Sequence, residues 1–276
     1  MNYENALNLD SKEFKRYTGV QKRTFQLMLK AWDEYYFSKS NAGRPPKLEP
    51  SDQLLVALQY WREYRTYFHI AQDWDISEAT VCRIVHRVET ILMNSGRFRL
   101  PGKKRLLQGF QIPEVVLIDV TQTPIERPKK GQKKYYCGKN KQHTLKCQII
   151  ADRNSGEIIC LFFGEGRRHD FHLFKVCGVH IHPETESLQD SGYQGIEAYH
   201  NNSYIPFKKP NNGELSQLER EYNHALSQER IGIEHINRSL KIFQILRGRY
   251  RNRRRRYNLR CNLIASIYNY ELSLAA

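Results

Sequence analysis

Three acidic residues stand where they could take part in metal-dependent chemistry. Asp119 ends the apolar run EVVLID, Asp190 opens the turn-forming stretch DSGYQG, and Glu234 lies within SQERIGIEHINRSLKIF. Carboxylates brought to one point repel one another, and their oxygen atoms are the ligands that hard divalent cations such as Mg²⁺ prefer. Two such cations about 4 Å apart can activate an attacking hydroxyl and stabilise the leaving oxygen of a phosphodiester. Three acids that converge would therefore favour phosphoryl transfer.

The residues around Glu234 predict an amphipathic helix. At helical spacing, its apolar stripe holds Ile233, Ile236, Leu240 and Phe243, and its polar face holds Arg230, Glu234, Asn237, Arg238 and Lys241. Such a face could bind phosphate around a metal ion. Alternatively, Glu234 forms surface ion pairs with Arg230 and Arg238, each worth only about 0.5 kcal/mol.

The balance of charge indicates a polyanionic partner. The 276-residue chain has 44 Lys and Arg against 29 Asp and Glu, a formal net charge of +15 at pH 7. A soluble protein with a charged coat is the alternative. The six cysteines form no Cys-x-x-Cys pair, and no run of about 18 apolar residues occurs, so we expect a protein of the cytoplasm that does not enter a membrane.

The N-terminal part, residues 1–98, predicts a helical DNA-binding region. At about 51–93, helical apolar spacing is interrupted by DIS, and Ser77 is a good N-cap for the next helix. Helix, short turn and helix is the layout of a helix-turn-helix, whose second helix enters the major groove. A small helical bundle with no role at DNA is the alternative. Arg44, in a Gly-Arg-Pro stretch, is expected in a DNA-contacting arm or in a plain linker.

The C-terminal part, residues 113–276, predicts an α/β domain that follows a linker at 99–112. EVVLID is a short apolar run of the buried-strand type, and HTLKCQIIAD and GEIICLFFG predict a hairpin joined at DRNSG. Beyond Leu215 the pattern becomes helical. The segment RGRYRNRRRRYNLR carries the densest run of cations, which could contact phosphates or form a solvated charged face.

Motifs of the C-terminal half occur in a known order. Between about residues 113 and 272 the chain reads IDVTQTPIERP, YYCGKNKQHTLK, GRRHDFHLF, DSGYQGI, IPFKKP, ERIGIEHINRSLKIFQIL and YRNRRRRYNLRCNLIASIYNYEL. In these motifs it resembles bacterial insertion-sequence transposases of family five, related to Harbinger-type nucleases, and GRPPKL with the helices after it resembles that family's N-terminal part. The resemblance implies an RNase H-like catalytic domain, a mixed central sheet flanked by helices, preceded by an all-α helix-turn-helix module.

The resemblance also implies a site and an activity. Asp119, Asp190 and Glu234 each stand inside the matching motif, which makes them the expected DDE triad and the ligands of two Mg²⁺ ions, for which Mn²⁺ would substitute. The expected activity is cut-and-paste transposition, in which a homodimer or larger synapse in the bacterial cytoplasm, associated with the nucleoid, binds terminal inverted repeats, cleaves double-stranded DNA and joins it to a target. A catalytically inactive or domesticated DNA-binding regulator, or a structure-specific nuclease, is the alternative.

A larger set of residues is expected to contact DNA. Its members are polar or cationic side chains in the helix-turn-helix, in the basic stretches or beside the acids: Arg44, Ser77, Thr80, Arg83, Arg87, Lys139, His143, Lys146, Arg168, His169, Lys208, Lys209, Arg238, Lys241, Arg253 and Arg254. Tyr135 and Tyr136 could also reach the DNA backbone, although aromatic residues of a hairpin more often pack inside the protein.

Overall fold

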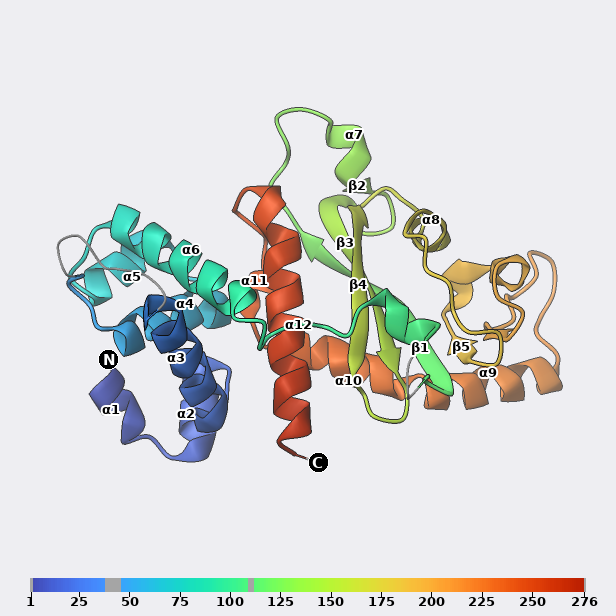
Figure 1. The fold of residues 1–276 in the computed structure, drawn as a ribbon. Helices are drawn as coiled ribbons and strands as arrows, with labels where there is room; N and C mark the ends of the chain where they lie inside the picture. The colour runs from blue at the N-terminus through green and yellow to red at the C-terminus, as the bar shows by residue number, and fades with distance from the viewer. Residues whose placement is uncertain (1, 38–45, 109–111, 276) are drawn as a thin grey trace. The chain divides into compact units, whose positions relative to one another are not determined.

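The computed structural model describes residues 2–37, 46–108 and 112–275, which form two compact units (Figure 1). Unit 1 comprises residues 1–99, 240–248 and 252–276, and unit 2 comprises residues 100–239 and 249–251. Arg44, predicted for a DNA-contacting arm, lies outside the described residues. None of the helices in the described ranges combines the length and hydropathy needed to cross a membrane.

Unit 1 is helical. Its elements are α1 (Tyr3–Leu7), α2 (Ser11–Thr18), α3 (Lys22–Phe37), α4 (Pro50–Glu63), α5 (Tyr67–Asp73), α6 (Glu78–Asn94), α11 (Gln244–Arg247), the 3-10 turn η4 (Arg254–Arg256) and α12 (Tyr257–Ser273). Side-chain caps begin both helices of the helix-turn-helix: Ser77, the predicted cap, accepts the Thr80 N–H at the start of α6, and Thr66, which was not predicted, accepts the His69 N–H at the start of α5.

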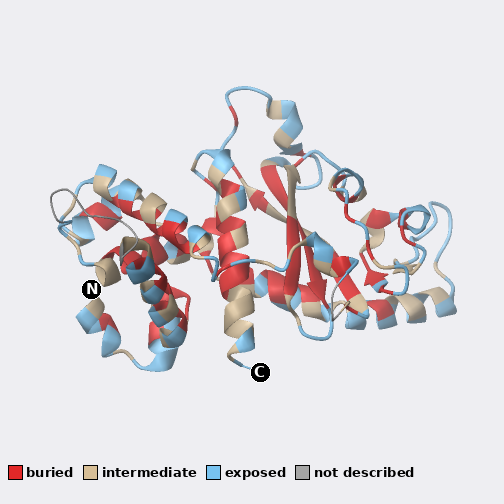
Figure 2. Ribbon diagram, viewed as in Figure 1, coloured by how far each residue is buried: buried red, intermediate tan, exposed pale blue. Residues whose placement is uncertain are grey.

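The apolar stripes predicted for α4 and α6 form the core of unit 1. Leu58 and Trp61 of α4 are buried, as are Val81, Val85 and Val88 of α6. The red segments of Figure 2 mark these inward faces. The short helix α5 packs against both α4 and α6. The helix-turn-helix is therefore part of a larger helical core.

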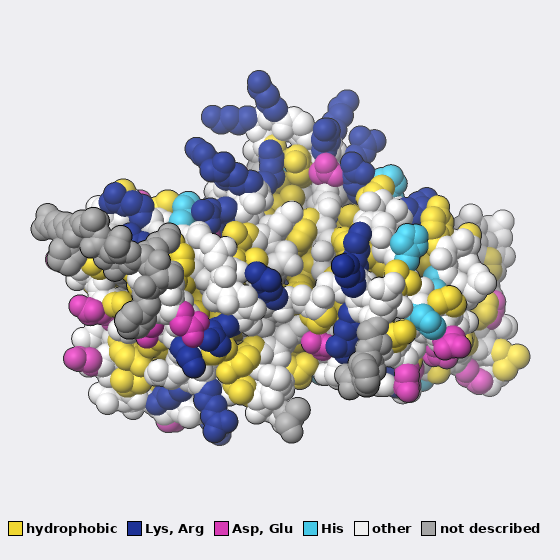
Figure 3. Space-filling model, viewed as in Figure 1, with side chains coloured by type: hydrophobic (Ala, Val, Ile, Leu, Met, Phe, Trp, Pro, Cys, Tyr) yellow, Lys and Arg dark blue, Asp and Glu magenta, His cyan; other side chains and the backbone are white. Residues whose placement is uncertain are grey.

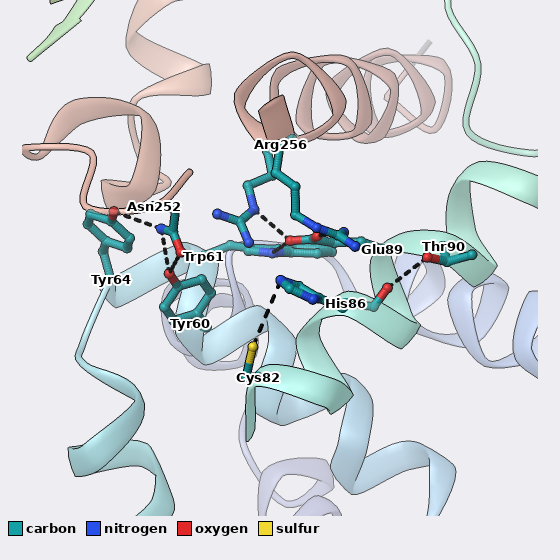
Figure 4. Close-up of polar contacts among 10 residues, drawn as sticks. Tyr60, Trp61, Tyr64, Cys82, His86, Glu89, Thr90, Asn252 and Arg256 are labelled. Carbon is teal, nitrogen blue, oxygen red and sulfur yellow. Dashed lines mark hydrogen bonds and ion pairs between the residues drawn. The ribbon is translucent and has the colours of Figure 1, made fainter. Parts of the chain in front are cut away.

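A buried carboxylate lies at the centre of unit 1 (Figure 4). Glu89 of α6 is 0% exposed, and its two oxygens lie 2.6 Å from Nε of Arg260 and 2.6 Å from Nη1 of Arg256. The indole N–H of Trp61 donates to the same carboxylate at 3.3 Å. Arg260 is itself 1% exposed, so this ion pair ties α6 to the C-terminal helix inside the core.

Unit 2 is built on a mixed sheet. Its strands are β1 (Val115–Pro124), β2 (Tyr136–Cys137), β3 (Gln142–Asp152), β4 (Ile158–Glu165), β5 (Glu186–Leu188) and β6 (Ser203–Tyr204). Its helices are η1 (Lys103–Leu106), α7 (Gln132–Tyr135), α8 (Asp170–Val176), η2 (Ser191–Tyr193), η3 (Ile196–Ala198), α9 (Gln217–Glu229) and α10 (Ile231–Leu240), whose last residue is counted in unit 1.

The described strands follow the order β2-β3-β1-β5-β6. β4 lies off this path and pairs with β3. β1, β3 and β4 are antiparallel, while β1, β5 and β6 run parallel. The predicted hairpin is present: its turn is closed by Asp152, whose side chain accepts the Asn154 N–H, and by Gly156 at φ +73°. Helices cover both faces of this sheet, as the sequence predicted.

The first strand is longer than its apolar run. The sequence placed its end at Asp119, but β1 continues through Pro124, and its pairing with β3 runs from Val116 and Asp152 to Pro124 and Thr144. That prediction was wrong because an antiparallel partner satisfies the backbone of polar residues as well as that of apolar ones. Asp119 therefore lies within the strand, where its backbone is fixed on one side by β3.

Alternation along β1 directs its side chains to two different layers. Val116 and Ile118 pack in the core with Ile150 of β3, Phe174 of α8 and Tyr193 of η2. Leu117 and Asp119 point to the opposite face, where a methyl group of Leu117 lies 3.1 Å from the space in which Gly232 of α10 would carry a Cβ. Gly232 thus lets α10 approach the strand closely.

Packing divides the chain differently from the predicted segments 1–98, 99–112 and 113–276. Residues 240–248 and 252–276 pack with the N-terminal helices, whereas residues 249–251 belong to unit 2, where the Tyr250 N–H donates to Pro124 O at 2.7 Å. The sequence did not indicate that the C-terminal helix joins the first unit. The assignment of functions to the predicted segments stays a prediction.

Candidate active site and nucleic-acid interface

Asp119 is held by two side chains from the end of α9 and from α10. Nδ2 of Asn237 donates to Oδ2 of Asp119 at 2.8 Å, and the Arg230 guanidinium lies 3.6 Å from Oδ1. The Asp119 side chain is 18% exposed. A carboxylate that is largely removed from water needs such donors to remain charged, and these two occupy different oxygens.

Asp190 follows the strand that pairs in parallel with β1. Leu117 pairs with Leu188, the last residue of β5, and Asp119 and Asp190 each come two residues after that pair. The Asp190 side chain also caps η2 by accepting the Gly192 N–H at 2.9 Å, which fixes the carboxylate just beyond β5.

Glu234 lies on the same stripe of the helical segment as the two donors to Asp119. Glu234 and Asn237 are three residues apart in α10, which places them on one side of that helix, and Arg230 stands at the junction between α9 and α10. Because Arg230 and Asn237 both reach Asp119, the Glu234 side chain between them starts from the helix face that is turned toward Asp119. Its side chain is exposed.

Burial raises the pKa of the Asp119 carboxyl above its ordinary value. The Arg230 guanidinium and the Asn237 hydrogen bond act in the opposite direction, while the charges of Asp190 and Glu234 raise the pKa further. The charges of Asp190 and Glu234 therefore act on the buried Asp119 carboxyl. Their mutual repulsion is the kind that a bound cation would relieve.

The raised pKa makes a prediction about stability without metal. A carboxyl whose pKa is higher in the folded than in the unfolded state stabilises the fold at low pH and loses that contribution as the pH rises through the folded pKa. At pH 7 the ionised Asp119 therefore opposes folding, and we expect Asp119→Asn to raise the thermal unfolding temperature of the metal-free protein. This gain in unfolding temperature should shrink toward acidic pH. A variant less stable than wild type at pH 7 would contradict a raised pKa of Asp119.

The donor set suits a hard divalent cation, although the side chains are not gathered around one point. Among the described residues, no three His, Cys, Asp or Glu side chains are arranged closely enough to hold a metal ion. The acids at 119, 190 and 234 offer only oxygen ligands, which Mg²⁺ and Mn²⁺ prefer. Oδ1 of Asn237 is buried beside them without a hydrogen-bond partner among the described residues, so this edge of the site retains an unused oxygen acceptor.

A fourth carboxylate lies next to Asp190. Asp170 of α8 and Asp190 flank Gly192, with Oδ2 and Oδ1 at 3.6 and 2.9 Å from the position of a Cβ on that glycine. Nζ of Lys146 donates to Oδ1 of Asp170 at 2.7 Å and to the Arg168 carbonyl at 2.5 Å. Burial, followed by the charges of Asp170, Asp119 and Asp190, raises the pKa of Tyr193 well above its ordinary value.

Lys146 thus lies away from solvent. It is 5% exposed, and its ammonium neutralises Asp170 on the face of β3 that carries Gln148 and Ile150. As a predicted DNA contact it would have to leave this pair. His169, Arg168 and Lys139 are exposed, and Arg168 pairs with Glu165 and lies 2.9 Å from His172.

The predicted recognition helix presents a polar outer face in unit 1. Ser77 and Arg83 are exposed, Thr80 and Arg87 are half-buried, and Arg87 donates to Gln53 at 3.1 Å. Nη2 of Arg83 lies 3.3 Å from the Thr80 hydroxyl. The hydroxyls of Ser77 and Thr80 lie 2.9 Å apart at the start of α6, where Ser77 is the N-cap.

Cations gather most densely in unit 2 on the segment between β1 and β3. Figure 3 shows Lys and Arg side chains around α7. Exposed members of this segment are Arg127, Lys129, Lys130, Lys133, Lys134, Lys139 and Lys141. Lys208, Lys209 and Arg238 are exposed elsewhere in unit 2; in unit 1, Arg253 and Arg254 are exposed and Lys241 is half-buried.

Sequence reasoning gave no specific role to the residues that hold Asp119. Asn237 and Arg230 were placed on the polar face of the Glu234 helix, as general phosphate-binding groups. The sequence did contain one signal for this role: Asn237 and Arg230 lie three and four residues from Glu234, and side chains at these spacings can face the same neighbour. The Lys146–Asp170 pair joins residues 24 positions apart and has no comparable signal.

Comparisons with known proteins identify the family. Residues 118–269 match the family described as DDE superfamily endonuclease, and residues 46–98 match the helix-turn-helix of DDE superfamily endonuclease. The chain is 50% identical over 276 residues to the probable transposase for insertion sequence element IS702 from Microchaete diplosiphon, and the match spans 100% of both chains.

The chain therefore belongs to the DDE superfamily of endonucleases. It is a DNA transposase of the DDE type, with the helix-turn-helix and the α/β RNase H-like unit that its motifs predicted. Membership of this family implies dependence on a divalent metal ion and binding to DNA.

Proposed function

We propose that this transposase binds the terminal inverted repeats of its element through α5 and α6, cleaves the DNA ends in unit 2 and joins them to target DNA by a cut-and-paste route. In this proposal residues 1–98 bind DNA, 113–276 form the catalytic domain with its basic C-terminal helical segment, and a homodimer or larger assembly holds two ends. Its place of action is the cytoplasm, at the nucleoid. The observation that carries the proposal is that the segments bearing the three acids adjoin one another: β1 pairs with β5, and Asn237 of α10 donates to Asp119.

Asp119, Asp190 and Glu234 are the proposed ligands of two Mg²⁺ ions, for which Mn²⁺ would substitute. Bound metal would supply an activated hydroxyl and stabilise the leaving oxygen of the phosphodiester. The donor set and the raised pKa of Asp119 support this role. No covalent link between protein and DNA is needed, since water and then a DNA 3′-hydroxyl serve as nucleophiles.

The protein side chains near the acids have separate tasks. Arg230 lies 3.6 Å from Asp119, so its guanidinium is placed to balance the charge of the acids and of a phosphate. Asn237 fixes the orientation of the Asp119 carboxylate through its 2.8 Å hydrogen bond. Arg238 is exposed one residue further along α10, and Lys208 and Lys209 supply further cations for the DNA backbone.

Recognition of the repeats is proposed for the outer face of α6. Arg83 is the exposed cation nearest the start of this helix, where helix-turn-helix proteins contact base edges. We expect Arg83→Ala to weaken binding to the element end by about 1–3 kcal/mol while leaving binding to unrelated DNA nearly unchanged. Arg16→Ala, which removes an exposed cation of α2 in the same unit, is the control. Equal losses on both DNAs would assign Arg83 to phosphate contact only.

The test is cleavage of labelled DNA that carries the element end and its flank. The full chain should nick the DNA at the element boundary with Mg²⁺ or Mn²⁺, should not do so with a chelator, and should join the released 3′-end to a second DNA. Binding without cleavage would favour a DNA-binding regulator derived from a transposase. Cleavage without joining or boundary preference would favour a structure-specific nuclease.

A further inference from the structure

A cavity in unit 2 lies apart from the acids. Its volume is about 670 Å³, within the range of about 300–1,000 Å³ that is usual for small-molecule sites. Its lining includes three cations, Arg127, Lys133 and Arg167, and two rings, Tyr136 and His143. None of the lining side chains that the structure describes is acidic. Cations together with ring faces are the two groups that a nucleotide requires.

The two rings in the lining form a cross-strand pair. Tyr136 of β2 lies opposite His143 of β3, and their ring centroids are 5.6 Å apart at 67°. Tyr136 is nevertheless 44% exposed, which is a large fraction for a tyrosine in a sheet. Because His143 covers only part of the tyrosine ring, the remaining surface is open to a second flat group.

Hydrogen bonds and close backbone packing fix the walls of the cavity. Nε of Arg127 donates to Oε1 of Gln132 at 2.9 Å, and the Arg167 N–H donates to the Lys134 carbonyl at 3.1 Å. Gly166 lets the chain pass so close to β3 that a Cβ there would lie 2.7 Å from Thr144 O and 2.5 Å from Tyr135 O. The Arg127 side chain and the backbone of Arg167 are therefore held in the lining before any ligand arrives.

The cavity and Asp119 lie on one face of the sheet. Asp119 pairs with Ile149, and alternation along β3 returns to the same face at His143, six residues away. At about 3.3 Å per residue the two positions are about 20 Å apart along the strand. A DNA chain with a phosphate at the acids could reach the cavity within a few nucleotides.

We infer that this cavity binds an unpaired nucleotide of the DNA, with its base against Tyr136 and His143 and its phosphates against Arg127, Lys133 and Arg167. An unpaired nucleotide fits better than duplex because a base within a duplex cannot present its face to a ring inside a cavity. The inference rests on the proposed function, since it assumes that the substrate is a DNA end.

The test compares two DNAs by fluorescence anisotropy with the full chain: a fully paired duplex, and the same duplex with a short unpaired thymine tail. Stacking of one base should raise affinity for the tailed DNA by about 5- to 100-fold. A tail without bases should give no such gain. Tyr136→Ala should abolish the gain, whereas Tyr136→Phe, which keeps the ring, should retain it.

Two cation variants separate the cavity from the general basic surface. Lys133→Gln removes a lining cation and should reduce the gain, while Lys129→Gln removes an exposed cation of the same segment outside the lining and should leave it intact. A gain that persists in Tyr136→Ala, or equal affinity of wild type for both DNAs, overturns the inference and leaves the proposed function standing. Failure to bind either DNA contradicts both.

Discussion

Asp119→Asn is expected to lower the rate of metal-dependent strand cleavage by about a thousandfold or more. Loss of a metal ligand removes several kcal/mol of transition-state stabilisation, and each ~1.4 kcal/mol corresponds to a tenfold change in rate. Asparagine keeps the shape of the side chain and can still accept a hydrogen bond from Asn237, so the change is confined to charge and ligand strength. The measurement is the initial rate of nicking at the element boundary at saturating Mg²⁺.

The control for this variant is Glu214→Gln, which removes one negative charge from an exposed loop of the same unit. Both variants should bind DNA at least as tightly as wild type, because each makes the protein more positive. Asp119→Asn is also expected to be no less stable than wild type without metal, so a lost activity could not be attributed to unfolding. Cleavage within about tenfold of wild type would remove Asp119 from the metal site.

Glu89→Gln is expected to lower the free energy of unfolding of unit 1 by about 3–5 kcal/mol. Glu89 is 0% exposed, and the variant would leave Arg260, itself 1% exposed, without its anionic partner. A buried charge without a partner costs the folded state far more than the original pair contributes to it. The expected loss is comparable to a large part of the stability of an ordinary domain.

Tryptophan fluorescence reports this unfolding selectively. The three tryptophans of the chain, Trp32, Trp61 and Trp74, all belong to unit 1, so a urea titration followed by their emission describes that unit. Glu34→Gln is the matched control: Glu34 pairs with Arg97 in the same unit but is 48% exposed, and its loss should change stability by no more than about 1 kcal/mol. Equal losses of stability in the two variants would show that the buried Glu89 pair contributes no more to stability than the exposed Glu34 pair.

Local patterns in the sequence predicted most of the elements. Ser77 was recognisable as a cap, and the apolar spacing of Val81, Val85 and Val88 gave the buried face of α6, because both signals depend on residues within two helical turns. The acids at 119, 190 and 234 were found through motifs rather than through their geometry. Their electrostatic coupling could be seen only once β1, β5 and α10 were placed together.

The errors share one physical cause, which is pairing between distant parts of the chain. β1 continues beyond Asp119 because β3 completes its backbone hydrogen bonds. The polar residues 121–123 do not predict this continuation. Lys146 stays a predicted DNA contact, and the sequence gave no sign that it is 5% exposed and paired with Asp170. The partner of Glu89 is 171 residues away, beyond the reach of any helical periodicity.

The position of Arg256 and Arg260 beside Glu89 bears on how the protein is made. The N-terminal helices are synthesised first. Arg256 and Arg260, whose guanidinium groups neutralise Glu89, are synthesised only when the chain reaches the start of α12. A product that terminates before residue 256 would carry the recognition helix α6 with an uncompensated charge in its interior. A chain that ends before residue 256 should therefore be less stable than the full chain and a ready substrate for cellular proteolysis.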